Sequence, residues 1–277
     1  MITSYLFVPG NRPDRIEKAI LAGIANAIII DLEDAIPFSE KERVRELVRG
    51  FLSENEIAAS MKLYVRVNDA TTTFYKEDVE MVAGFPEVGI MLPKTESPFD
   101  IQQVVESIEL DQSIIPLIET AKGVLHAFDI AVSSNQISRL AFGAVDYCLD
   151  INTSISDHGQ ELIYPRSALV VASRAAHLEP PIDTVFVDLS DEEGLIREIH
   201  RAKNLGMSAK LCIHPKQLEP VNTLFAPSEA DIAWATKVVE SFEEALANGL
   251  SAIRLDNKMI DLPVYKQALA TLNGIGK

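Results

Sequence analysis

The segment Ile114-Ile115-Pro116-Leu117-Ile118-Glu119 contains the pattern that decides the fold: an apolar run of strand length that ends in an ionisable residue. Runs of this kind, apolar nearly throughout and mostly rich in Val and Ile, are typical of parallel strands that are covered on both faces. The same pattern recurs along the chain. The eight predicted strands are Tyr5–Val8, Ala27–Ile30, Leu63–Val67, Val88–Leu92, Ile114–Ile118, Leu140–Phe142, Thr184–Val187 and Lys210–Ile213.

Helix-length segments with apolar residues at three- and four-residue spacing separate these runs; examples are Arg15–Ala22, Glu40–Leu52, Ile101–Ile108 and Glu192–Asn204. This alternation predicts a parallel α/β fold. A (β/α)8 TIM barrel fits eight such units best, and the 277 residues exceed the roughly 250 that such a barrel needs. A doubly wound open sheet is the alternative, because periodicity alone does not prove that the sheet closes.

The chain continues beyond the eighth predicted strand. Ser228 with Asp231 forms the pattern of a helix N-terminus, and Gly249 ends that helix. Asp256-Asn257 lies between two short apolar runs and predicts a hairpin turn, and a last helix is expected from about Pro263. The chain therefore ends in a helix–hairpin pattern rather than in another strand of the barrel.

We predict a TIM-barrel catalytic domain over residues 1–248 and a C-terminal helix–hairpin extension over residues 249–277. The extension has apolar residues that need a surface to pack against, and exposed patches of this kind usually mark an interface. We therefore expect the extension to pack at a subunit interface. The alternative is that it packs against the barrel of its own subunit. These residues are Ile253, Leu255, Met259, Ile260, Leu262 and Val264.

The composition excludes several classes of function. A net charge of −16 and a sequence pI near 4.7 leave no basic stripe for nucleic acid and disfavour an anionic membrane surface. The start of the sequence lacks a signal-peptide pattern, and no apolar run approaches the ~20 residues of a membrane span. Cys148 and Cys212 fall in or beside apolar patterns and are expected to be buried free thiols. We expect a cytoplasmic protein.

Nearly every predicted strand ends in ionisable residues. In barrel enzymes the reacting groups lie on the loops that follow the strands, so these side chains are expected to converge on one rim. The alternative for any single residue is that an apolar strand simply ends where the protein becomes polar. The candidates are Asn11, Arg12, Asp31, Glu33, Asp34, Arg66, Asn68, Lys94, Glu96, Glu119, Asp146, Asp188 and His214.

The acids among these candidates suggest a magnesium site. Mg²⁺ prefers oxygen ligands and keeps several waters, so one or two carboxylates suffice. Glu119 and Asp146 follow consecutive strands, which are neighbours in a barrel, so their carboxylates can meet over the rim. The cluster of Asp31, Glu33 and Asp34 is interpreted instead as partners of other site residues or as helix caps. The sequence contains no zinc spacing, Gly-x-Ser-x-Gly elbow or Walker loop.

A metal beside a cation suggests a reaction class. The metal can chelate a hydroxy or oxo acid and polarise its carbonyl, while the guanidinium of Arg66 can bind a carboxylate or a developing enolate oxygen. This combination suits aldol or Claisen-type cleavage. Lys94 offers a competing Schiff-base mechanism, which requires a depressed pKa of its amine.

Seven motifs, spread in order over the chain, resemble the citrate lyase β-subunit-like family, whose relatives include malyl-CoA and citramalyl-CoA lyases among the metal-dependent aldolases. They are Leu6–Pro13 (LFVPGNRP), Asp31–Ala35 (DLEDA), Leu92–Glu96 (LPKTE), Leu117–Ala121 (LIETA), Ala141–Tyr147 (AFGAVDY), Lys210–Pro215 (KLCIHP) and Lys258–Asp261 (KMID). The resemblance implies a (β/α)8 barrel that assembles as a homotrimer or hexamer.

The resemblance also implies roles for particular residues. Glu119 and Asp146 are then the Mg²⁺ ligands, with Glu119 also serving in catalysis and substrate binding. Arg66 is implied to bind substrate and to stabilise the enolate. Asp261 is implied to act as the acid/base group, delivered across a subunit interface.

Coenzyme A is the second group that the resemblance implies, as part of the substrate. The loop with Asn11 and Arg12, together with Lys18, is implied to approach it. One position departs from the family pattern, because Thr3 stands where an arginine usually precedes the first motif. We expect this difference to remove a cation beside the thioester pocket.

The leading hypothesis is a Mg²⁺-dependent carbon–carbon lyase that cleaves a 3-hydroxyacyl-CoA-type thioester, malyl-, citramalyl- or citryl-like. The first alternative is the β subunit of a citrate lyase complex, which acts on citryl bound to an acyl-carrier protein. The second is a barrel that binds acyl-CoA without turnover. Arg66, Glu119, Asp146 and Asp261 argue against the second, because a pure binding protein needs no acid/base residue.

Overall fold

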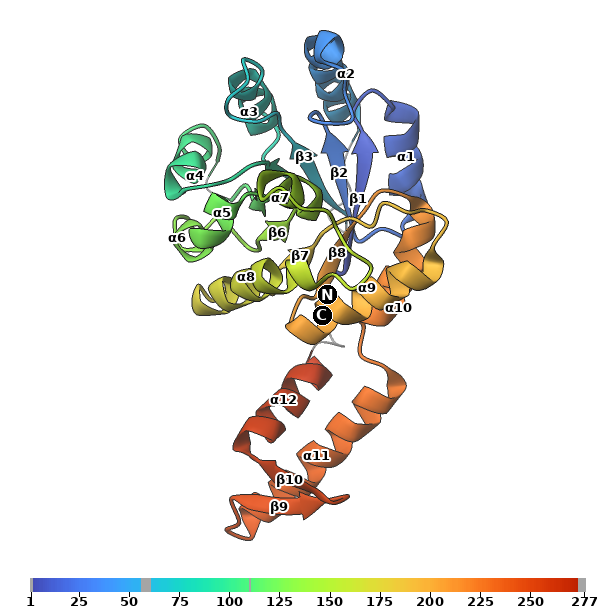
Figure 1. Ribbon diagram of the computed structural model, residues 1–277, viewed down its shortest axis with the longest axis vertical. Helices are drawn as coiled ribbons and strands as arrows, with labels where there is room; N and C mark the ends of the chain where they lie inside the picture. Colours follow the sequence, from blue (N-terminus) through green and yellow to red (C-terminus); the bar gives the residue numbers. More distant parts are fainter. Residues whose placement is uncertain (1, 56–60, 110, 274–277) are drawn as a thin grey trace. The chain divides into compact units, whose positions relative to one another are not determined.

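The computed structural model describes residues 2–55, 61–109 and 111–273. The chain forms two compact units, of which the first spans Ile2–Asn222 and the second begins at Thr223. Each unit has its own arrangement of strands and helices (Figure 1). Among the described helices, none is both long and apolar enough to cross a membrane.

The first unit is a closed barrel of eight parallel strands in the order of the sequence. The first strand pairs with the second and also with the eighth, where Ser4 lies opposite Lys210. This pairing closes the sheet, which confirms the predicted (β/α)8 barrel and excludes the open sheet. The strands are β1 (Ser4–Pro9), β2 (Ala27–Asp31), β3 (Lys62–Arg66), β4 (Val88–Leu92), β5 (Ile114–Ile118), β6 (Ala141–Phe142), β7 (Ile182–Asp183) and β8 (Ala209–Cys212).

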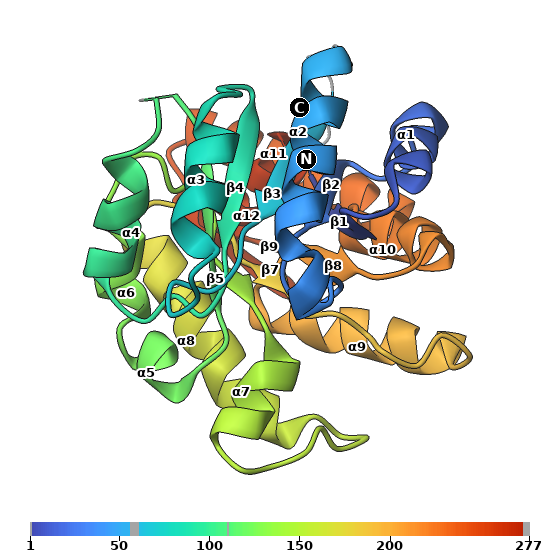
Figure 2. The same cartoon turned by 90° about the horizontal axis from the view of Figure 1, so that it is seen from above.

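Helices surround the strands, as the view in Figure 2 shows. The α-helices are α1 (Pro13–Ala22), α2 (Lys41–Glu54), α3 (Tyr75–Ala83), α4 (Pro98–Val105), α5 (Ala121–Leu125), α6 (Ala127–Ala131), α7 (Ala144–Asp150), α8 (Ile163–Ala175), α9 (Glu192–Leu205) and α10 (Leu218–Phe225). The described residues also form the short 3-10 helices η1 (Phe38–Glu40), η2 (Gln160–Leu162) and η3 (Pro215–Gln217).

Side chains fill the interior of the barrel, as alternation along each strand requires. Tyr64 occupies much of this space, and a Cβ on the neighbouring Gly89 would lie 2.4 Å from its ring, so only glycine fits there. Cys148 and Cys212 are buried free thiols, as predicted. The interior cluster consists of Tyr5, Ala27, Ile29, Tyr64, Met91, Ile115, Leu117, Ala141, Ile182, Ala209 and Leu211.

The seventh strand was predicted two residues too late. It spans Ile182–Asp183, whereas the apolar segment Thr184–Val187 is irregular. Val187 is 62% exposed, so this segment has already left the wall of the barrel. The segment lies at the rim, where Thr184 and Val185 line a cavity. It was predicted as a strand because β-branched residues are enriched in strands.

A network of buried charges holds two helices against the outside of the wall. Asp183 is fully buried and accepts hydrogen bonds from Arg166 Nε of α8 (2.7 Å) and Lys210 Nζ of β8 (2.6 Å). Arg166 Nη2 also donates to Glu198 of α9 at 2.6 Å. Each buried charge therefore has a partner of opposite sign, and the attraction between the partners offsets the free-energy cost of removing each charge from water.

The second unit contains a long helix, a hairpin and a shorter helix. They are α11 (Glu229–Ala247), β9 (Ala252–Leu255), β10 (Lys258–Asp261) and α12 (Leu262–Asn273). Ser228 and Asp231 form the predicted capping box. Asp256 and Asn257 form the predicted turn, both with positive φ, as a tight hairpin of this kind requires.

The second unit has a core of its own, to which the long helix contributes. Phe242 of α11 stacks on Tyr265 of α12, and Ile260 of β10 is buried with them. The units therefore divide between Asn222 and Thr223, because the long helix packs on the hairpin and last helix. Of the six apolar residues noted in the extension, only Met259 and Leu262 remain largely exposed, at 71% and 48%.

Removal of the carboxylate charge at position 183 should destabilise the barrel strongly. Asp183→Asn leaves Lys210 and much of the charge of Arg166 buried without a partner, which costs roughly 3–5 kcal/mol of the free energy of unfolding. Urea denaturation followed by circular dichroism measures the change. Asp188→Asn, in which an exposed acid is replaced, is the matched control and should change the free energy by less than about 0.5 kcal/mol. Equal effects of the two substitutions would contradict the network's role.

Candidate functional site

A cavity of about 420 Å³ lies at the carboxyl ends of the strands. This is the end of a TIM barrel at which reacting groups gather. Its walls combine charged groups with an apolar surface. The residues that line it are Phe7, Pro9, Asp31, Asp34, Ala35, Arg66, Leu117, Glu119, Gly143, Val145, Asp146, Thr184, Val185, Leu211 and Ile213.

Arg66 is fixed in this cavity by Asp31. The two residues end neighbouring strands and lie opposite each other in the β2–β3 register. Arg66 Nε and Nη2 each donate to one carboxylate oxygen of Asp31 at 2.7 Å, which gives a two-pronged contact. The guanidinium also lies 4.8 Å from the ring centre of Phe7. Because one edge of the guanidinium is taken by Asp31, only the remaining N–H groups can meet a ligand.

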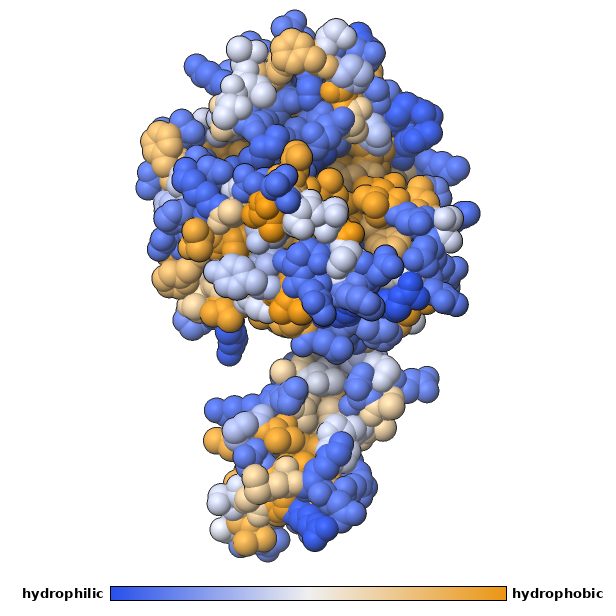
Figure 3. Space-filling view, viewed as in Figure 1, coloured by the Kyte–Doolittle hydropathy of each residue, from blue (hydrophilic) through white to orange (hydrophobic). Residues whose placement is uncertain are grey.

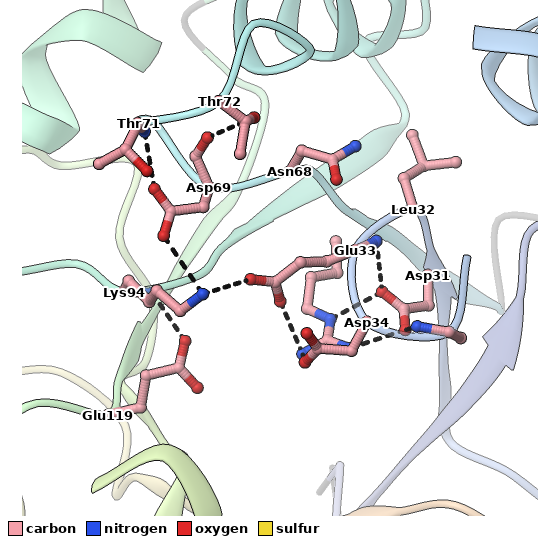
Figure 4. A network of polar contacts seen from close by, with 12 residues as sticks. Asp31, Leu32, Glu33, Asp34, Asn68, Asp69, Thr71, Thr72, Lys94 and Glu119 are labelled. Atoms are coloured by element: carbon pink, nitrogen blue, oxygen red, sulfur yellow. Dashed lines mark hydrogen bonds and ion pairs between the residues drawn. The ribbon is translucent and has the colours of Figure 1, made fainter. Parts of the chain in front are cut away.

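Two further acids lie beside the same guanidinium. Arg66 Nη1 lies 2.9 Å from Glu33 Oε2 and donates to Asp34 Oδ2 at 3.2 Å (Figure 4). Burial raises the pKa of Glu33 to about 7, although the charge of Arg66 opposes this shift. These contacts agree with the interpretation of the three acids as partners of Arg66, whereas none of them caps a described helix. Asp31 also accepts from the backbone N–H groups of Glu33 and Ala35 in its own loop.

Glu119 follows β5 and is 2% exposed. Its Oε1 accepts a hydrogen bond from the backbone N–H of Lys94 at 2.8 Å. Burial, and then the charges of Glu33 and Asp146, raise the pKa of Glu119 to about 8. A Cβ on Gly143 would lie 2.4 Å from Glu119 Oε2, so a glycine is needed to leave room for the carboxylate.

Asp146 lies in the first turn of α7 and lines the same cavity as Glu119. The charge of Asp146 is one of the causes of the raised pKa of Glu119, after burial and the charge of Glu33. A divalent cation would offset this repulsion, so the donor set fits Mg²⁺. Among the described residues no group of three or more His, Cys, Asp or Glu could hold a metal. Mg²⁺ usually keeps several waters, so one or two carboxylates would suffice for it.

Lys94 is unsuited to Schiff-base chemistry. Its Nζ lies 3.3 Å from both Glu33 and Asp69. Burial lowers the pKa of this amine, but the charges of the two carboxylates outweigh burial and raise the pKa above its ordinary value. A nucleophilic amine must be neutral, so the geometry disfavours the competing mechanism.

Other rim candidates have local structural partners instead of facing the cavity. The Asn68 amide donates to Asp78 at 2.6 Å. His214 accepts from the backbone of Lys216 and caps η3. Asp188 accepts from Ser190, and Glu96 pairs with Lys122 at 3.0 Å. For these residues the simpler interpretation, that strands end where the protein becomes polar, is correct.

The residues expected near coenzyme A lie at the start of α1 and along it. Asn11 is partly buried in the turn after β1, and Lys18 is exposed. Arg12 forms a two-pronged exposed ion pair with Asp14, at 2.9 and 2.8 Å. An exposed pair of this kind contributes little to stability and can open when an anion binds.

The expectation for Thr3 was wrong. Thr3 precedes β1 at the opposite end of the strand from the cavity, about 20 Å away along six residues. Its hydroxyl contacts the side chains of Asn26 and Asn222, both at 2.8 Å. Because it lies at the far end of the barrel, the absence of an arginine there removes no cation from the site.

Asp261 is the last residue of β10 in the second unit, directly before α12. Its Oδ1 accepts from the backbone N–H of Val264 at 3.2 Å, so it caps the last helix. The carboxylate is partly exposed.

The sequence analysis missed two contributors to the site. The backbone N–H of Lys94 binds Glu119, and Gly143 provides the space beside it. A glycine directly after a strand and just before an expected ligand was a signal for Gly143. No signal marked the backbone of Lys94, because a lysine at this position gives no hint of an unusual conformation.

Comparison with known proteins agrees with this geometry. A sequence model described as HpcH/HpaI aldolase/citrate lyase matches residues 3–215. The chain belongs to this family. A second model, described as a carbon–carbon bond lyase of the TIM-barrel fold, matches residues 171–269. The resemblance stated from the motifs is therefore confirmed, and the chain is a member of a family of aldolases and lyases that cleave carbon–carbon bonds.

Individual members of the family match nearly the whole chain. The citrate lyase subunit β of Leuconostoc mesenteroides is 36% identical over 95% of this chain and 89% of its own length. The (3S)-malyl-CoA thioesterase of Cereibacter sphaeroides is 32% identical over 98% and 95%. The crystal structure of the protein CitE from Mycobacterium tuberculosis, in complex with magnesium, acetoacetate and coenzyme A, is 29% identical, with a TM-score of 0.84 over 99% and 98%.

Replacement of Arg66 by lysine should impair this family member without unfolding it. An ammonium cannot make the two-pronged contact with Asp31 and still present N–H groups to the cavity. Arg66→Lys should lower lyase kcat/KM by about tenfold or more, as expected when a donor to a developing oxyanion is displaced. Arg43→Lys, at an exposed arginine of α2, is the control. Kinetics like those of the unmodified protein in the Arg66 variant would remove this residue from the site.

Proposed function

We propose that this protein is a Mg²⁺-dependent carbon–carbon lyase that cleaves a 3-hydroxyacyl-CoA-type thioester, malyl-, citramalyl- or citryl-like, by a retro-Claisen or aldol mechanism. The observation that carries the proposal is the meeting of Glu119, Asp146 and Arg66 in one cavity of the rim. Two acids that favour a cation lie beside a fixed guanidinium that can meet developing negative charge. Family membership supports the same reaction class.

Glu119 and Asp146 are the proposed metal ligands. When bound, Mg²⁺ supplies a Lewis acid that polarises the carbonyl or hydroxyl oxygen of the acid portion of the substrate. The relative from Mycobacterium tuberculosis was crystallised with magnesium, acetoacetate and coenzyme A, which supports both the metal and the thioester. Glu119 thereby serves substrate binding and catalysis as well as metal binding.

Cleavage requires movement of one proton from the substrate hydroxyl and of one electron pair from the broken bond. As the hydroxyl becomes a carbonyl, the electrons of the carbon–carbon bond pass into the enolate of the thioester. The remaining N–H groups of Arg66 are proposed to stabilise negative charge on oxygen, with Asp31 keeping the guanidinium in place. Asp261 is proposed as the acid/base group: its carboxylate accepts the proton of the substrate hydroxyl and returns it to the enolate carbon, so that no proton is gained or lost.

Coenzyme A is proposed to lie along the loop after β1. Asn11 and Arg12 are in this loop, and Lys18 follows on α1. Arg12 would exchange its exposed contact with Asp14 for a phosphate, which is a stronger acceptor for a planar fork. Apolar surface near the cavity can accept the uncharged arm of the cofactor: hydrophobic side chains gather over α7 (Figure 3), where Val145 and Leu149 are exposed.

Two other functions remain as alternatives. The 36% identity to a citrate lyase subunit β favours a role within such a complex, with citryl on an acyl-carrier protein as the substrate. An acyl-CoA-binding barrel without turnover is disfavoured by the intact set of Arg66, Glu119 and Asp146. A cytoplasmic location stays a prediction.

A substrate screen tests the proposal. Purified protein with Mg²⁺ is incubated with malyl-, citramalyl-, citryl- and hydroxymethylglutaryl-CoA, and the released carbonyl product is measured. We expect turnover of at least one thioester without other subunits, loss of activity in EDTA and recovery with added Mg²⁺. Turnover of citryl-acyl-carrier protein, with none of the four thioesters turned over, would favour a role in a citrate lyase complex. Full activity in EDTA, with borohydride trapping of substrate on Lys94, would contradict the metal mechanism.

We also propose that the protein forms a homotrimer or hexamer and that the second unit packs at a subunit interface. Most apolar residues of the hairpin are used within that unit, but Met259 and Leu262, which flank Asp261 closely in sequence, are exposed. Exposed apolar residues beside an acid are consistent with insertion of this segment into a neighbouring site.

Mixed subunits test where Asp261 acts. If it enters another subunit's site, Asp261→Asn protein and Glu119→Ala protein are each inactive but regain activity when their subunits exchange, because some sites combine both intact residues. Asp256→Asn, at the exposed turn of the same hairpin, should stay active and serves as the control. Exchange is followed by native mass spectrometry. Demonstrated exchange with no recovery would mean that Asp261 acts in its own subunit or not at all.

A further inference from the structure

Lys94 adopts an unusual backbone conformation at the rim of the barrel. Its φ is +47°, in the left-handed region that most side chains avoid. The other described non-glycine residues with positive φ are Asn152, His177, Asp256 and Asn257, which belong to the types that tolerate this region best. Lys94 is the exception among them, and a conformation of this kind persists only where the surroundings hold it.

The ion pairs of the Lys94 side chain can hold this backbone conformation. Its ammonium lies 3.3 Å from Glu33 Oε1, in the loop after β2, and 3.3 Å from Asp69 Oδ2, in the loop after β3. Asp69 is itself fixed, because it accepts from the backbone N–H of Thr71 at 2.7 Å. Figure 4 shows the lysine extended between the two carboxylates. The ammonium is therefore anchored at two points on loops other than its own.

The main chain of Lys94 faces a different group. Its backbone N–H donates to Glu119 Oε1 at 2.8 Å, and Glu119 belongs to the loop after β5. Of the described residues, those lining the cavity include Glu119 but not Lys94 or Glu33. The lysine thus contacts a cavity residue through its backbone while its charge is directed elsewhere.

We propose that Lys94 is a positioning residue, whose ammonium, anchored by Glu33 and Asp69, holds the left-handed backbone that fixes the carboxylate of Glu119 for the metal. The proposal rests on the proposed function, in which Glu119 is a metal ligand. It assigns to the lysine a role that is neither nucleophilic nor directly electrostatic. Partners that orient metal ligands in this way commonly affect metal affinity when they are changed.

A charge effect and a positioning effect predict opposite results. Loss of a cation near two carboxylates makes the site more negative, so a purely electrostatic role predicts tighter binding of a divalent cation by Lys94→Met. Loss of the anchor lets residue 94 leave the left-handed region and removes the hydrogen bond to Glu119, which predicts weaker binding. Glycine enters the left-handed region freely, so Lys94→Gly should keep the backbone geometry without any side chain.

The test measures the affinity of the whole protein for Mn²⁺ by electron paramagnetic resonance of the free ion. Lys94→Met and Lys94→Ala should bind Mn²⁺ about tenfold more weakly than the unmodified protein. Lys94→Gly should stay within about threefold of it. Lys122→Met, which removes an exposed rim cation paired with Glu96, is the matched control. Melting temperatures confirm that each variant is folded.

The outcomes separate this proposal from the function on which it rests. Unchanged or tighter Mn²⁺ binding by Lys94→Met and Lys94→Ala overturns the positioning role, and so does equal weakening in the glycine variant. Glu119→Gln is measured beside them. If it binds Mn²⁺ as well as the unmodified protein does, the proposed metal site itself fails. If Glu119→Gln loses Mn²⁺ binding while the Lys94 variants keep the affinity of the unmodified protein, only the positioning role fails.

Discussion

Closure of the sheet by pairing of β1 with β8 is the constraint from which the site follows. In a closed parallel barrel the strands all end at one rim, and residues from distant parts of the chain are brought within contact distance there. Arg66 ends β3, and Lys94 and Glu119 follow β4 and β5; each contacts an acid or a backbone group from another segment. The rim therefore concentrates charge that no single segment of the sequence contains.

Gathering like charges at the rim raises their free energy, and the two parts of the rim differ in how this repulsion is compensated. Around Arg66, three carboxylates share one guanidinium, so the cation is held rigidly and its own charge is largely compensated. No cation among the described residues forms an ion pair with Glu119, and burial with the charges of Glu33 and Asp146 raises its pKa to about 8. The rim thus contains one region, around Arg66, in which the charges are paired, and a second, around Glu119, whose acids favour the binding of an added cation.

The sequence predicted those features that depend on local pattern. Seven strands, the capping box at Ser228 and the turn at Asp256 follow from periodicity and residue type, and the structure agrees with them. The prediction of the seventh strand was wrong, because Thr184–Val187 is irregular and its first two residues line the cavity. The packing of α11 on α12, which joins the long helix to the second unit, was not predicted, because it is a tertiary contact that periodicity along one segment does not reveal.

The two ends of the barrel contain buried arginines in opposite settings, and the contrast explains why only one end is suited to chemistry. Arg139 is 2% exposed near the start of the strands and donates to the carbonyls of Ile2 and Pro180, at 2.7–2.9 Å. Most of its acceptors are neutral, including these carbonyls and the Ser208 hydroxyl at 2.6 Å, and its carboxylate contact, Glu179, lies 3.7 Å away, so this cation fastens the barrel. Arg66, at the other end, is held by side-chain carboxylates beside a cavity. Charged groups whose partners line an open cavity can respond to a ligand, whereas those enclosed by backbone cannot, so binding and turnover belong at the rim.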